Sequence, residues 1–194
     1  MLTTSENLGA DAIAALAREG YRGIALYSAP RGRVGVDLSD NTNLWGAPPA
    51  ALRAVTSIGE EDVARYPVAY EPALAAVLAD YAGVSPAMIA CGCGSDDVLD
   101  SAIRAFAEPG EVLCLPDPSF GMIPVFARTN GLSPVSIPLT RSFDVDVDAM
   151  LETGARITYL CSPNNPTGSV IPRRIMERIV ENARGLVIID QAYV

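Results

Sequence analysis

Short apolar runs alternate with amphipathic segments along residues 87–190. The apolar runs predict strands at 87–91, 111–115, 134–138, 156–161 and 186–190. The segments between them have the apolar spacing of helices, at about 95–107, 118–128, 146–153 and 172–183. Strands that alternate with helices are typical of a mostly parallel sheet covered on both faces. We therefore predict an α/β fold.

The pattern is weaker before residue 87. The spacing predicts a helix at 8–19, a short strand at 34–38, and helices at about 48–57 and 71–82. Because the first part of the chain is less regular, we expect an N-terminal arm or part of a small domain at 1–45. A large domain is expected at 46–194.

Composition narrows the class of protein. Hydrophobic residues make up 49 % of the 194 residues and charged residues 19 %, which favours a packed globular core. The net charge is −9, and the longest basic run is Arg173-Arg174, so the sequence argues against nucleic-acid binding. No apolar run approaches the roughly 18 residues that span a bilayer. The first residues lack the features of a signal peptide, and we expect a cytoplasmic protein.

Two short motifs invite a metal-binding interpretation. Cys91-Gly-Cys93 has no CxxC partner and the chain has no histidine, so no metal site is predicted there. All four cysteines sit in or just after apolar runs and are expected to be reduced core thiols. Asp144–Asp148 resembles the start of a calcium loop, but Ala149 and Ala155 stand where glycine and glutamate are needed. A solvated turn before an acidic helix start is the better interpretation.

The segment Cys91–Asp97 links a predicted strand to a predicted helix. Its two glycines allow a tight turn, and Ser95 or Asp96 can cap the helix. The free N–H groups of the first helical turn could also hold a phosphate. Asp97 stands where a dinucleotide-binding fingerprint needs its third glycine, which excludes that motif. A plain capped turn and a phosphate site both remain open.

Three predicted strand ends carry residues that could contact a ligand. Asp190 ends a buried strand, where a carboxylate could pair with a protonated pyridine nitrogen or with an internal arginine. Asn165, in a tight turn, would lie near Asp190 if the two strands are neighbours. Tyr193 could donate to an oxygen beside the same ring. Phe120 could stack on a planar ligand or pack into the core.

These segments occur in an order that resembles a known family. They are Asp37–Gly46, Arg65-Tyr-Pro67, Gly92–Asp97, Glu108-Pro-Gly110, Pro118–Met122, Ser162–Gly168 and Asp190–Tyr193. Together they resemble the class I/II, fold-type-I aminotransferases that use pyridoxal 5′-phosphate (PLP). The similarity is greatest to the histidinol-phosphate aminotransferase branch and runs from about Val36 to Tyr193.

The resemblance implies a role for each matching position. It assigns the PLP phosphate to Gly94, Ser95 and Asp96, the ring face to Phe120, the ring's 3′-oxygen to Asn165 and Tyr193, and the ring nitrogen to Asp190. Trp45 stands where the family has a tyrosine that reaches the PLP phosphate of the partner subunit. The resemblance therefore also implies a homodimer.

One residue that the family requires is absent. All fourteen basic residues are arginines, so no lysine is present to hold PLP covalently. The family places this lysine beyond the segment that matches Asp190–Tyr193. We therefore expect the N-terminal half of an enzyme that exchanges amino groups between an amino acid and a 2-oxo acid or imidazole-acetol phosphate. This chain is expected to be inactive by itself.

Two alternatives remain for the function. One is a PLP enzyme similar to threonine-phosphate decarboxylase. The other is a non-catalytic protein that uses the same sheet for binding or dimerisation.

Overall fold

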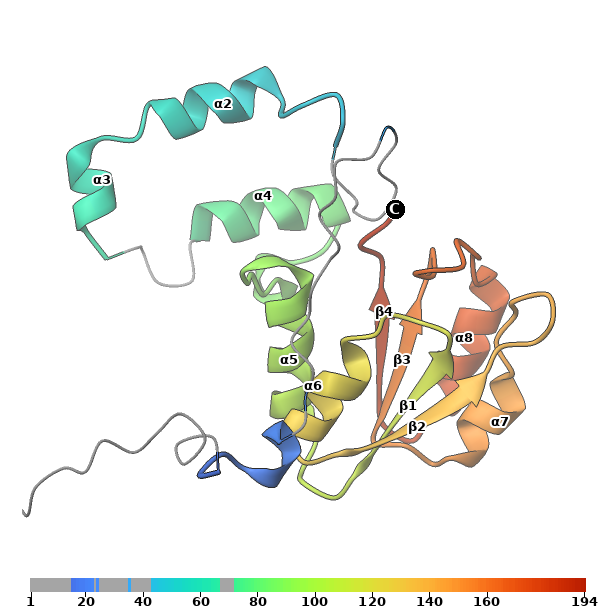
Figure 1. Cartoon of the computed structure of the whole chain (residues 1–194). Helices are drawn as coiled ribbons and strands as arrows, with labels where there is room; N and C mark the ends of the chain where they lie inside the picture. Colours follow the sequence, from blue (N-terminus) through green and yellow to red (C-terminus); the bar gives the residue numbers. More distant parts are fainter. Residues whose placement is uncertain (1–14, 23, 25–34, 36–42, 67–71) are drawn as a thin grey trace, which may run out of the picture. The chain divides into compact units, whose positions relative to one another are not determined.

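The structure is a computed structural model that describes residues 15–22, 24, 35, 43–66 and 72–194 (Figure 1). The chain forms two compact units. The first comprises Met1–Ile24 and Gly92–Val194, and the second comprises Ala25–Cys91. The predicted site residues other than Trp45 all belong to the first unit.

A four-stranded sheet forms the centre of the first unit. Its strands are β1 (Val112–Asp117), β2 (Ser133–Pro138), β3 (Ile157–Cys161) and β4 (Leu186–Asp190). They lie in the order β2-β1-β3-β4, and neighbouring strands are parallel. Their carboxyl ends therefore meet at one edge of the sheet (Figure 1). The predicted α/β fold is confirmed.

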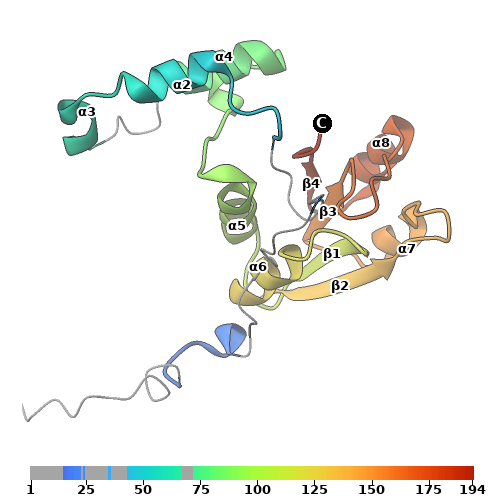
Figure 2. The same cartoon turned by 45° about the horizontal axis from the view of Figure 1, so that its top comes forward.

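Helices cover both faces of this sheet. α5 (Gly94–Phe106) and α6 (Ile123–Thr129) pack on one face, and α7 (Val147–Glu152) and α8 (Arg173–Asn182) on the other (Figures 1 and 2). Two buried clusters join helices to sheet, one including Leu99, Ile103 and Ile123 and the other including Met150 and Ile179.

The side chains of β3 alternate between the two buried clusters. Tyr159 and Cys161 belong to the cluster beneath α5 and α6, whereas Leu160 belongs to the cluster beneath α7 and α8. Successive side chains of a strand point to opposite faces, so a central strand between two helical layers must be apolar throughout. Every residue of β3 is buried.

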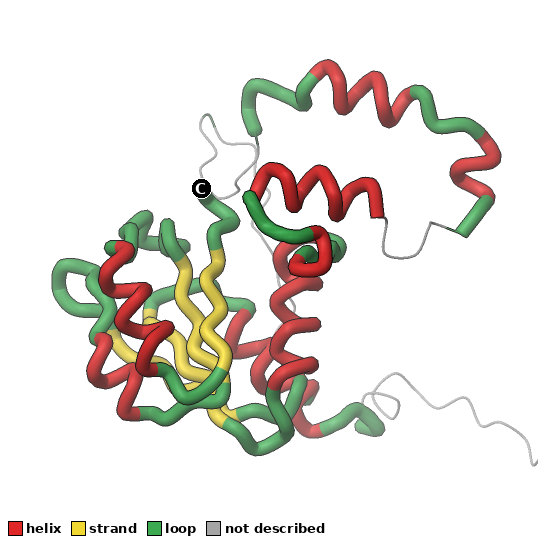
Figure 3. Tube along the Cα trace, turned by 180° about the vertical axis from the view of Figure 1, so that it is seen from behind, coloured by secondary structure: helices red, strands yellow, loops and turns green. Residues whose placement is uncertain are grey.

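The second unit contains α2 (Pro49–Thr56), α3 (Glu60–Ala64), α4 (Pro72–Ala82) and the short 3₁₀ helix η2 (Pro86–Met88) (Figure 3). The helices predicted at 48–57 and 71–82 are confirmed. α3 was not predicted, because its five residues are too few to show a helical period. Its start is fixed by the Gly59 N–H, which donates to the Asp62 carboxylate at 2.9 Å.

Several sequence predictions need correction. The strand predicted at 87–91 is wrong: η2 occupies its beginning, and no described residue pairs with the rest. An apolar run becomes a strand only where a partner satisfies its backbone. The helix predicted at 118–128 starts later, at Ile123, because a turn follows β1.

Two predictions fall wholly or partly outside the described residues. The strand predicted at 34–38 lies outside them, apart from Gly35. Of the helix predicted at 8–19, the described part forms turns and then the 3₁₀ helix η1 (Glu19–Tyr21). None of the helices in the described parts of the chain is long and apolar enough to cross a membrane.

A close backbone approach fixes β4 against β3. A Cβ atom added to Gly185 would lie 2.0 Å from the Arg156 carbonyl oxygen, which accepts a hydrogen bond from the Leu186 N–H. We expect Gly185→Ala to lower the free energy of unfolding by about 1–3 kcal/mol, as overpacking does. Urea denaturation measures this. Gly121→Ala is the matched control, since its Cβ would meet nothing within 4 Å; equal stability of the two variants would contradict the prediction.

Candidate functional site

The turns after β3 and β4 bring two predicted residues together. The strands are neighbours, with Cys161 opposite Asp190 in their register. The Ser162 N–H continues this pairing by donating to the Asp190 carbonyl at 2.9 Å. Beyond it, Asn165 Nδ2 donates to the Tyr193 hydroxyl oxygen at 3.0 Å. The Asn165 amide and the Tyr193 hydroxyl therefore lie side by side at the carboxyl edge of the sheet.

The carboxylate of Asp190 is held through both of its oxygens. The Tyr159 hydroxyl donates to Oδ2 at 2.8 Å, and the Ala192 N–H donates to Oδ1 at 3.0 Å. Asp190 is partly buried and forms no ion pair with any residue that the structure describes. The arginine partner that the sequence left open is thus absent from the described chain. A carboxylate has about four acceptor positions, so capacity remains for a cationic ligand.

Tyr159 was missed by sequence reasoning. Its side chain is 0 % exposed and lies within the cluster beneath α5 and α6. Burial, followed by the hydrogen bond to the Asp190 carboxylate, raises the pKa of Tyr159 far above its ordinary value. The phenol therefore stays protonated and donates to Asp190. The sequence offered one signal for it. Tyr159 lies two residues before the end of an apolar run, so it points to the same face of the sheet as the last residue of that run.

Asn164 joins the turn after β1 to the turn after β3. Its Oδ1 accepts from Ser119 Oγ at 2.7 Å, and its Nδ2 donates to the Pro118 carbonyl at 3.0 Å and to Thr167 Oγ1 at 2.8 Å. The residue is 5 % exposed. These bonds fix the turn that carries Phe120 against the turn that carries Asn165.

The ring of Phe120 takes part in the core. It is partly buried and packs against the cluster beneath α5 and α6. Core packing, one of its two possible roles, is therefore observed. Its remaining exposed surface leaves the stacking role as a prediction.

The start of α5 offers backbone donors. Gly94 has φ +80°, a conformation that favours glycine. The predicted cap by Ser95 or Asp96 is wrong: Asp97 Oδ2 instead accepts from the Cys93 N–H at 2.8 Å. The first N–H groups of a helix, here including those of Ser95 and Asp96, have no carbonyl partner within it.

The N-terminus of α5 lies at the same end of the first unit as the carboxyl ends of the strands (Figure 1). The helix runs back across the sheet before β1 begins, so its N-terminus lies at the edge where the strands end (Figure 1). That arrangement suits an anion such as a phosphate.

Trp45 lies in the second unit and is 95 % exposed. Its backbone N–H donates to Asn43 Oδ1 at 3.1 Å within a local turn. Its predicted contact with a partner subunit stays a prediction.

The cysteine prediction is half right. Cys114 and Cys161 are buried, and burial raises the pKa of both thiols. Cys91 and Cys93 are exposed, because the run that precedes them does not form a strand. All four are free thiols. Within the described ranges no three Cys, Asp or Glu side chains are grouped so as to hold a metal ion.

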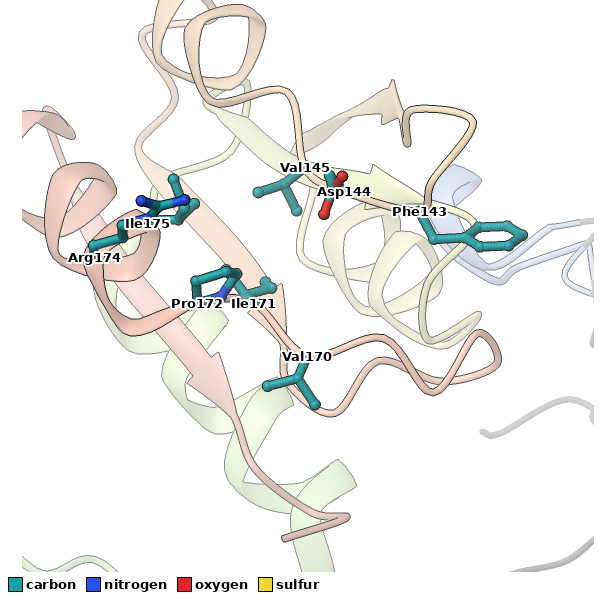
Figure 4. A pocket seen from close by; sticks show the side chains of 8 residues that line it. All are labelled: Phe143, Asp144, Val145, Val170, Ile171, Pro172, Arg174 and Ile175. Atoms are coloured by element: carbon teal, nitrogen blue, oxygen red, sulfur yellow. The ribbon is translucent and has the colours of Figure 1, made fainter.

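A surface pocket lies elsewhere, beside α7 and α8. Figure 4 shows that its side chains come from the loop before α7, the segment that leads to α8, and the first turn of α8. It contains none of the residues predicted to bind a ligand. Asp144 and Arg174 are its charged members, and the rest of its lining is apolar.

These features define an open α/β protein with a group of polar side chains at the carboxyl edge of a parallel sheet, the edge at which proteins of this class bind their ligands. The family profile described as "Aminotransferase class I and II" matches residues 33–194. The chain therefore belongs to the class I and II aminotransferase family. The predicted family is confirmed.

Individual relatives agree with this assignment. The chain is 36 % identical to the histidinol-phosphate aminotransferase of Thermobifida fusca over 185 residues, which are 91 % of this chain and 50 % of that protein. The histidinol-phosphate aminotransferase of Cytophaga hutchinsonii is also 36 % identical, with the same coverage. The chain thus spans about half the length of the curated relatives it matches.

Solved structures agree with the fold. The crystal structure of histidinol-phosphate aminotransferase from Sinorhizobium meliloti, in complex with pyridoxal-5′-phosphate, superposes with a TM-score of 0.70 at 26 % identity. The superposition covers 77 % of this chain and 42 % of that one. An aminotransferase from Mycobacterium tuberculosis gives a TM-score of 0.66 at 25 % identity.

Proposed function

We propose that this chain supplies the PLP-binding half of an aminotransferase similar to histidinol-phosphate aminotransferase. The observation that carries the proposal is the environment of Asp190. Its carboxylate is held by two donors, lacks a cationic partner among the described residues, and lies at the same sheet edge as the Asn165–Tyr193 pair. A protonated pyridine nitrogen and a neighbouring ring oxygen suit these two groups.

Each residue would have a distinct task. Asp190 would keep the ring nitrogen protonated, while Asn165 and Tyr193 donate to the ring's 3′-oxygen. The hydrogen bond from Asn165 Nδ2 to the Tyr193 oxygen leaves the tyrosine hydroxyl proton free to donate. Gly94, Ser95 and Asp96 would offer backbone N–H groups to the phosphate. Phe120 would contact the ring face with its exposed surface.

PLP, when bound, supplies an electron-accepting ring that stabilises the substrate as it loses its α-proton. The chain described here contributes binding and orientation to this reaction. The reactive amine is a separate matter, because the 194 residues contain no lysine. We therefore propose that a segment outside this sequence provides that amine, in agreement with the half-length match to the relatives.

The names of the relatives support a proposal for the substrates. Both named relatives are histidinol-phosphate aminotransferases, which favours histidinol phosphate and a 2-oxo acid as the substrate pair. We also propose a homodimer in which the exposed Trp45 reaches the cofactor phosphate of the partner subunit.

The first test extends the sequence and assays the complete protein. Sequencing the coding DNA past the codon for Val194 should reveal a continuing frame that encodes a lysine. The complete protein, incubated with PLP, histidinol phosphate and 2-oxoglutarate, should then produce glutamate. The 194-residue chain should produce none, and borohydride treatment should attach no pyridoxyl group to its side chains. A complete, lysine-containing protein that fails to bind PLP would contradict the proposal.

A further inference from the structure

Tyr159 contacts Asp190 because of the register of two parallel strands. Tyr159 lies opposite Ile188, and Asp190 is two residues further along β4. Side chains two residues apart point to the same face of a sheet, so Tyr159, Ile188 and Asp190 share one face. The offset along the strand is about 6.6 Å, at roughly 3.3 Å per residue. A tyrosine is long enough to span this offset with its hydroxyl, whereas a serine or threonine is not.

The burial of Tyr159 makes this contact specific. The side chain is 0 % exposed, and a buried phenol needs a hydrogen-bond partner. Its partner here is the carboxylate, at 2.8 Å. A hydrogen bond to a charged acceptor is stronger than one between neutral groups. The ring belongs to a buried cluster that joins residues of β1, β3, α5 and α6, so the position of the donor is fixed by the core.

A second donor contacts the other oxygen of the Asp190 carboxylate. The Ala192 N–H contacts Oδ1 at 3.0 Å, and Tyr159 contacts Oδ2. With one donor on each oxygen, rotation of the carboxylate would break at least one hydrogen bond. The remaining acceptor positions are therefore held in fixed directions before any ligand arrives.

We infer that Tyr159 is a positioning residue, which orients the Asp190 carboxylate toward the ring nitrogen of bound PLP. This inference rests on the proposed function. Removal of the hydroxyl leaves Asp190 held through one oxygen only, so the carboxylate can rotate and pairs less well with the ring. Tyr159 touches neither substrate nor cofactor in this scheme and acts through Asp190.

The test is Tyr159→Phe in the complete protein, which removes one oxygen atom and keeps the ring. We expect the Kd for PLP to rise about tenfold, because a carboxylate that is free to rotate pairs less well with the ring nitrogen. We also expect kcat to fall by a similar factor while KM changes little. The ¹⁵N resonance of PLP labelled at the ring nitrogen should show deprotonation at lower pH than in the unsubstituted protein.

Two controls separate positioning from packing. Thr158→Val removes a neighbouring hydroxyl, also buried, that points to the opposite face of β3; it should leave the Kd and the ¹⁵N titration unchanged. In an Asp190→Asn background, Tyr159→Phe should add no further loss of PLP affinity. If Tyr159→Phe lowers only the melting temperature, with the Kd and titration unchanged, the inference is overturned.

The proposed function can fail separately. If the unsubstituted complete protein does not bind PLP, the proposed function falls, and the inference falls with it. If it binds PLP and only the Tyr159 predictions fail, the inference alone is wrong. Should the phenylalanine variant not fold, 3-fluorotyrosine at position 159 keeps the shape and strengthens the donor. The ¹⁵N titration must then shift, and an unchanged titration overturns the inference.

Discussion

Replacement of Asp190 with alanine is expected to lower the kcat of the complete protein by about 10²–10³-fold. The substitution removes the anion that would keep the pyridine nitrogen protonated, so the ring becomes a weaker electron acceptor. It also leaves the buried Tyr159 hydroxyl without its acceptor. Steady-state kinetics with histidinol phosphate and 2-oxoglutarate would measure the loss.

Gln191→Glu is the matched control for this experiment. Gln191 is the next residue and is exposed, so the added charge is screened by solvent. Its kcat should stay within about twofold of the unsubstituted protein. Near-normal activity of Asp190→Ala would show that the pyridine nitrogen has another partner.

Asn164→Ala is expected to lower the free energy of unfolding by about 3 kcal/mol. The estimate comes from three side-chain hydrogen bonds at about 1 kcal/mol each. Loss of the amide also frees the turn after β1 from the turn after β3. Because these turns carry Phe120 and Asn165, PLP affinity should fall together with stability. Urea denaturation and PLP titration measure the two effects.

Asn182→Ala provides the comparison, since it removes an asparagine at the exposed end of α8 with a single side-chain bond to the Arg178 carbonyl. Its cost should stay within about 0.5 kcal/mol. If both alanine variants were equally stable, the side chain of Asn164 would not be what holds the two turns together.

The sequence predicted the elements that tertiary packing also requires. β1 to β4 and α5, α7 and α8 have apolar periods that match the faces they bury, so their positions followed from spacing alone. The run at 87–91 is equally apolar, but a strand forms only where a neighbouring strand satisfies its backbone hydrogen bonds. The spacing of apolar residues does not show where such a neighbour lies. The late start of α6 reflects the turn after β1, in which the Pro118 carbonyl accepts a hydrogen bond from Asn164, 46 residues away along the chain.

The residues of the candidate site likewise divide into those whose positions the sequence could predict and those that it could not reveal. The positions of Asp190, Asn165 and Tyr193 at the carboxyl edge of the sheet could be predicted because each ends or follows a strand, and ligands of parallel sheets bind at that edge. Tyr159 and Asn164 could not, since their roles depend on the strand register and on the path of two turns. A buried tyrosine in an apolar run looks like an ordinary core residue until the neighbouring strand is known.

The alternation along β3 gives adjacent positions different evolutionary latitude. Tyr159 points toward Asp190, whereas Leu160, the next residue, points into the cluster beneath α7 and α8. A change at Leu160 can be compensated by neighbours such as Met150 and Ile179 without altering the ligand site. A change at Tyr159 has no such remedy, because the hydroxyl must reach one particular carboxylate. We therefore expect substitutions along this one strand to meet two separate constraints, shape on one side and, if Tyr159 positions Asp190 as we propose, chemistry on the other.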